Sequence, residues 1–210
     1  MKTTKLLFFC AMALLFAACE GGNVNDRKIS IEGDSSDDGT SQQDGGGSSS
    51  QSAIETGKFF DVEAATIEYT DGSVLMFENY GLNFKLHTTV PENLFIYNGT
   101  TLWECDVNSM SYEEYSEPEN SHAAGYGALA EYLFTSEMEA VLKISPYVVR
   151  STQTIAGISC TVYRDGEDGD AYAGHKGIIF LLGDDLIASS YAETCDAEFV
   201  VPEGYTKIEY

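Results

Sequence analysis

Basic residues are scarce in this chain. Of its 210 residues, 11 are lysine or arginine and 34 are aspartate or glutamate, which gives a formal net charge of −23. Such a surface repels nucleic-acid phosphates and anionic lipid head groups. Nucleic-acid binding is therefore excluded as a function, and the acidity is expected to serve mainly solubility.

Cysteine is also sparse, and its spacing fits no redox or metal site. Two of the five cysteines lie at the N-terminus, which leaves Cys105, Cys160 and Cys195 for a folded domain. Three thiols allow at most one disulfide, with three pairings among which the sequence does not choose. None belongs to a Cys-x-x-Cys pair or lies at ligand spacing from a histidine, so we expect no metal site and no cofactor.

Catalytic signatures are missing as well. The sequence contains no Gly-x-Ser-x-Gly elbow, no His-Glu-x-x-His helix and no glycine loop of the phosphate-binding kind. The histidines are His87, His122 and His175, and His87 is interpreted as a surface residue on the polar face of a strand. No spacing among the 34 acids singles out a glycosidase pair. The sequence thus predicts a protein that is not an enzyme.

The N-terminus carries a secretory signal. Lys2 and Lys5 precede an uncharged apolar run at 6–18, which is shorter than the roughly 20 residues that span a bilayer. Leu15-Phe16-Ala17-Ala18-Cys19 resembles the lipobox of bacterial lipoproteins, in which the cysteine receives a diacylglycerol and the preceding peptide is removed. The alternative is an ordinary cleaved signal with a chance cysteine. We predict a signal peptide at 1–18 and a lipid anchor on Cys19.

The anchor predicts where the protein works. Fatty acylation of Cys19 implies attachment to a membrane of the cell envelope. Glu20 follows the cysteine where an aspartate would resemble the inner-membrane retention signal of enteric bacteria. We therefore expect the outer membrane, with the periplasmic and the external face both left open.

A polar linker follows the anchor. Residues 20–56 have seven glycines, eight serines, eight acids against two bases, and no aromatic residue. Too few apolar side chains are present to offset the entropy of ordering, so 19–56 is predicted to be a disordered acidic linker, and a chain of this length spans about 35 Å on average.

Residues 57–210 have the composition of one folded domain, because all 13 tyrosines and the single tryptophan lie there. Alternating apolar residues and turn dipeptides such as Asp71-Gly72 and Asn98-Gly99 predict an antiparallel meander. Its strands are expected at 64–70, 74–78, 82–87, 94–97, 101–107 and 110–115. Trp103, Cys105 and Val107 share one face of their strand.

A helical segment interrupts the strands. Residues 123–134 have helical spacing, and Ser136 with Glu139 predicts the cap of a second short helix, ending near Leu142 before Pro146. Six more strands are then expected, at 148–155, 158–164, 177–182, 186–192, 199–201 and 207–210. The continuously apolar 177–182 is predicted to be central and covered on both faces.

The predicted fold class is α+β and mostly antiparallel β, with one or two helices inserted after the first half of the sheet. Strands such as 74–77 carry apolar side chains on both faces. One face must pack on a core, and the other requires cover from the helices, a partner or a ligand.

Four stretches carry a resemblance to a known family: YGLNFKLHTT (80–89), YNGTTLWECDVNSMSYEEY (97–115), AGISCTVYRDG (156–166) and FVVPEGYTKIEY (199–210). With the order of elements, they resemble the lipoprotein-localisation-factor (LolA/LolB-like) domains of exported bacterial proteins, across about 58–210. The resemblance implies a curved incomplete barrel of about 8–11 strands around helices, and an apolar concave face that holds acyl chains. It assigns no lining residues.

Two functions follow as expectations. The first is a membrane-anchored lipoprotein whose domain binds a hydrophobic ligand, an acyl chain or lipid, between sheet and helices. The alternative is an interaction or scaffolding lipoprotein with a filled core and no small-molecule ligand, whose protein partner the sequence does not identify.

Overall fold

The computed structural model describes residues 57–209. Two helices, α3 (Pro118–Leu129) and α4 (Ser136–Ile144), interrupt the strands. Six strands precede them: β1 (Ala65–Tyr69), β2 (Val74–Glu78), β3 (Asn83–Thr89), β4 (Glu92–Tyr97), β5 (Leu102–Asp106) and β6 (Ser111–Tyr115). Six follow: β7 (Val148–Ile155), β8 (Ile158–Asp165), β9 (Ala171–His175), β10 (Ile178–Leu182), β11 (Leu186–Ala192) and β12 (Thr206–Lys207). Short 3₁₀ helices lie at η1 (Asn79–Gly81) and η2 (Ala130–Tyr132).

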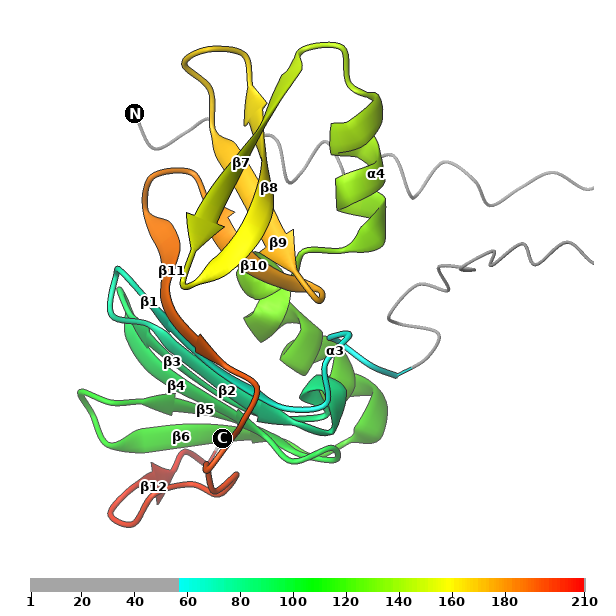
Figure 1. The fold of residues 1–210 in the computed structure, drawn as a ribbon. Helices are drawn as coiled ribbons and strands as arrows, with labels where there is room; N and C mark the ends of the chain where they lie inside the picture. Colours follow the sequence, from blue (N-terminus) through cyan, green and yellow to red (C-terminus); the bar gives the residue numbers. More distant parts are fainter. Residues whose placement is uncertain (1–56, 210) are drawn as a thin grey trace, which may run out of the picture. The chain divides into compact units, whose positions relative to one another are not determined.

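The strands form one open sheet of twelve, in the order β12-β6-β5-β4-β3-β2-β1-β11-β10-β9-β8-β7. Neighbours are antiparallel except β12, which runs parallel to β6. In Figure 1, β1–β6 form a curved layer with α3 along one face, while α4 lies beside β7–β9. The predicted α+β class and the position of the helices are confirmed; the sheet has one strand more than the range expected.

Turn chemistry sets the hairpins where the sequence predicted them. The Asn98 side-chain oxygen accepts hydrogen bonds from the backbone amides of Thr100 and Thr101, and Gly99 adopts φ +89° between β4 and β5. In the β1–β2 turn, the Asp71 carboxylate accepts a hydrogen bond from the Ser73 amide. Both predicted hairpins are confirmed.

The period-two pattern places the core. Phe84 and Leu86 of β3 are fully buried, while Asn83, Lys85 and His87 are only half-buried. Ile178–Leu181 of β10 are buried on both faces, as the apolar run predicts. The main core therefore fills the face of the sheet that α3 covers.

The opposite face of β4 and β5 is covered by the chain itself. Leu94, Ile96 and Cys105 form a second small core, and the segment after β11 packs on it. That segment contributes Phe199, Val201 and Tyr205. This contact supplies the cover that the second apolar face requires here, without helix, ligand or partner.

The predicted helix bounds were partly wrong. α3 begins at Pro118, five residues before the predicted Ala123, because a proline at the first turn has the helical φ and needs no amide partner. The N-cap of α4 is Thr135, whose hydroxyl accepts a hydrogen bond from the Met138 amide at 3.1 Å. The predicted cap, Ser136, is instead the first residue of the helix. The helix also continues to Ile144.

The C-terminal strands differ too. Residues 199–201 form no strand: Phe199 and Val201 pack on the second core, but the backbone of this segment pairs with no strand. The last strand is Thr206–Lys207 rather than 207–210. Cys105, Cys160 and Cys195 are all free thiols in this structure.

Candidate functional site

The space between α3 and the sheet, where a hydrophobic ligand was expected, is occupied by aromatic rings. Phe84 and Tyr97 project from β3 and β4 with ring centroids 5.7 Å apart. Gly125 of α3 faces them, and a Cβ added there would make ordinary van der Waals contact, 3.5 Å from the Phe84 ring and 3.7 Å from the Tyr97 ring. Phe84 and Tyr97 are both buried beneath the helix.

Aromatic contacts continue on the other side of this core. Phe134 stacks on Tyr163 with centroids 6.4 Å apart, and Tyr69 meets Tyr132 edge-on at 5.3 Å. Phe134 also presses on the backbone of Gly174 in β9, so closely that a Cβ there would overlap its ring. Two pockets in residues 57–209 lie outside the sheet–helix interior.

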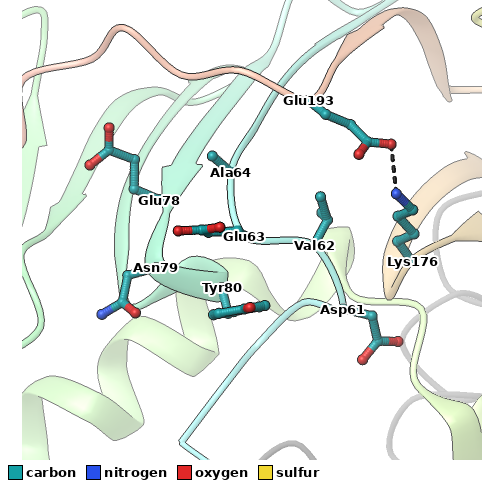
Figure 2. Close-up of a pocket in the computed structure, with 9 residues that line it drawn as sticks. All are labelled: Asp61, Val62, Glu63, Ala64, Glu78, Asn79, Tyr80, Lys176 and Glu193. Atoms are coloured by element: carbon teal, nitrogen blue, oxygen red, sulfur yellow. Dashed lines mark hydrogen bonds and ion pairs between the residues drawn. The ribbon is translucent and has the colours of Figure 1, made fainter.

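The first of these pockets is an acidic groove of about 720 Å³. Figure 2 shows Lys176 turned toward Glu193 at one end and Glu78 with Asn79 at the other. The Lys176 ammonium donates to the Glu193 carboxylate at 2.7 Å. The full lining is Asp61, Val62, Glu63, Ala64, Glu78, Asn79, Tyr80, Lys176 and Glu193.

Hydrogen bonding and burial shift the pKa values of three side chains at or beside this groove. The hydrogen bond from Lys176 lowers the pKa of Glu193. Burial, and then the neighbouring Lys176, lower the pKa of His175, whose ring meets Tyr191 edge-on at 5.6 Å. Burial raises the pKa of Tyr191, with the Glu193 charge adding to it. The lowered pKa favours a neutral His175, whose ring packs edge-on against Phe180 and Tyr191.

The other two histidines, His87 and His122, lie on separate elements. His87 of β3 approaches Glu92 at 3.7 Å, in agreement with a surface position. His122 of α3 stacks on Phe59 at 5.1 Å. Within residues 57–209, no group of three or more His, Cys, Asp or Glu side chains could hold a metal ion.

The most unusual surface lies where α4 meets β7. Four large apolar side chains are exposed within nine residues of chain: Val141 (45%), Ile144 (82%), Tyr147 (76%) and Val149 (54%). We call these residues the α4–β7 patch. Arg150 of β7 ties the two elements together, because its side chain donates a hydrogen bond to the Lys143 carbonyl of α4. Exposed apolar residues gathered in this way mark binding surfaces in soluble domains.

Charge also distinguishes this region. Residues 140–164 contain no acidic residue, although the chain has 34, and they carry Lys143, Arg150 and Arg164. Lys143 pairs with Glu139 at 2.8 Å, and Arg164 donates to the Gly169 carbonyl. The patch therefore sits in the least acidic part of an acidic protein. The gap in the acids was visible in the sequence, but its position beside exposed apolar side chains was not.

Cys19, the predicted lipid-anchor residue, lies outside the described residues, as do the signal 1–18 and the whole linker 19–56. No helix in the described part of the chain is long and apolar enough to cross a membrane. No family model matches the chain, and no curated protein matches it significantly. The candidate site therefore rests on the geometry of the chain itself.

Proposed function

We propose that this protein is a lipid-anchored envelope lipoprotein that acts by binding a protein partner through the α4–β7 patch. The observation that carries the proposal is the combination of a filled interior with four large apolar side chains left exposed within the short segment from Val141 to Val149. Apolar area that folding leaves in water lowers the free energy when a partner covers it.

The proposed anchor and linker suit this role. Acyl chains on Cys19 would hold the protein at an envelope membrane, and Glu20 favours the outer membrane. A linker over 20–56 with a mean span of about 35 Å would let the domain reach partners above that membrane. The high local concentration at one membrane then makes a modest affinity sufficient.

The alternative is the hydrophobic-ligand function, which stays a prediction. An acyl chain between α3 and the sheet would require Phe84 and Tyr97 to leave their positions against Gly125. Opening such a contact costs dispersion energy and exposes apolar area. The packing therefore favours the interaction function, and the acidic groove with its Lys176–Glu193 pair supports no catalytic role.

Photo-crosslinking in intact cells tests the interaction function. We expect p-benzoylphenylalanine at Val149 to give one discrete protein adduct after irradiation, because a bound partner covers this side chain. The matched control is the same substitution at Val90, which is 92% exposed in the β3–β4 turn and lies outside the patch. Loss of the adduct at both positions, or the same adducts from both, would contradict the proposal.

A further inference from the structure

We infer that the outer edge of β7 binds an extended, acidic segment of the partner as an added strand of the sheet. This inference rests on the proposed function and specifies how the partner binds. Strand β7 is the last in the sheet order, and among residues 57–209 only β8 pairs with it along its length. Its side chains from Val149 to Thr154 are all exposed.

The backbone of β7 presents unpaired groups at regular intervals. The β7–β8 hairpin closes through Ala156 and Gly157, with φ +48° and +81°, as in a two-residue type I′ turn. In such a hairpin the residues next to the turn form a hydrogen-bonded pair, and bonded pairs then alternate with unbonded ones. Arg150, Thr152 and Thr154 therefore direct their amides and carbonyls away from β8.

The usual protections of a sheet edge are missing from this strand. β7 is eight residues long, continues in register with β8 from Val148 to Ile155, and contains no proline, lysine or glycine. The other edge of the sheet, β12, is two residues long. An edge that is long and regular, and with which no further strand among residues 57–209 pairs, is the template that strand addition requires.

The charge of β7 indicates which kind of segment binds its outer edge. Residues 140–164 contain no acidic residue, and the one charged side chain of β7 itself is Arg150. An acidic strand would set carboxylates against Arg150, while its alternate apolar side chains cover Val149. The chemistry of this edge thus fits a segment in which acidic and apolar residues alternate.

The test is peptide binding to the full-length protein by fluorescence anisotropy. The probe is a labelled, end-blocked peptide of alternating glutamate and valine, with the same length as β7; its control has lysine in place of glutamate. Thr152→Pro removes one outward amide and keeps the bonds to β8, whereas Thr152→Val keeps that amide. We expect Thr152→Pro to weaken binding about tenfold, Thr152→Val to bind within about twofold of the parent, and the lysine peptide to bind weakly.

A second variant tests the inference if Thr152→Pro disturbs the fold. Should Thr152→Pro change the circular dichroism spectrum, Arg150→Glu reverses the local charge without touching the backbone, and the same loss is expected from it. Equal binding by the parent and the folded Thr152→Pro variant would overturn the inference. So would equal binding of the two peptides, tighter binding to phosphatidylglycerol vesicles, or concentration-dependent dimerisation that Thr152→Pro abolishes.

The two proposals fail differently. An adduct at Val149 that persists in Thr152→Pro cells would retain the interaction function and remove strand addition. Absence of any adduct at Val149 would remove the interaction function itself.

Discussion

Gly174→Ala is expected to destabilise the folded domain by about 3 kcal/mol, lowering the melting temperature by roughly 10 °C. The cause is steric, because a Cβ at this position of β9 would overlap the ring of Phe134. Phe134 is itself buried and stacked on Tyr163, so the ring has little room to move aside. Thermal and urea denaturation followed by circular dichroism measure the effect.

Gly127→Ala is the matched control for this change. Gly127 lies in α3, where an added Cβ would meet nothing within 4 Å, so alanine should stabilise the helix by about 1 kcal/mol. Equal stability of Gly174→Ala and the parent would contradict the tight packing of Phe134 against Gly174.

Cys19→Ala is expected to abolish acylation of the protein. Without the thiol there is no site for the diacylglycerol, so signal removal by the lipoprotein route should stop as well. The variant should incorporate no alkyne-tagged palmitate, and it should migrate as the 210-residue precursor. Metabolic labelling followed by gel electrophoresis of membrane fractions measures both results.

Cys10→Ala is the control for the anchor, because Cys10 lies inside the apolar run of the signal and is not the predicted acceptor. It should label and fractionate like the parent. Palmitate labelling that survives Cys19→Ala, or a variant of the same size and location as the parent, would refute the anchor and with it the envelope setting of the proposal.

Local chemistry made much of the fold predictable. Asn98-Gly99 and Asp71-Gly72 require backbone geometry that short polar residues and glycine supply, and both form the expected turns. Strand β3 follows from the alternation that buries Phe84 and Leu86. These features depend on a few neighbouring residues, which is why the sequence alone reveals them.

Features that depend on contacts between distant segments were harder to predict. Residues 199–201 look like a strand, but Phe199 and Val201 instead cover the second core on β4 and β5. Tyr163 shares its face of β8 with the exposed Ser159 and Thr161, yet it is buried against Phe134 and donates a hydrogen bond to Glu139 of α4. No local pattern specifies these partners.

The candidate site was missed for the same reason. The sequence predicted a ligand between helices and sheet, because apolar strands and a helical insert do not reveal whether side chains fill the space between them. Filling depends on contacts such as Phe134 stacking on Tyr163, residues about thirty positions apart in the chain. The α4–β7 patch likewise depends on which apolar residues the tertiary structure leaves uncovered.

The central claim is that the interior is filled and that the domain works through its surface. Mass spectrometry of the mature protein, extracted from membranes and passed through detergent exchange, tests it most directly. We predict the mass of the chain with its acyl groups on Cys19, and no lipid released when the protein is unfolded. One equivalent of a single acyl lipid per chain, retained through detergent exchange and released only on unfolding, would contradict the account.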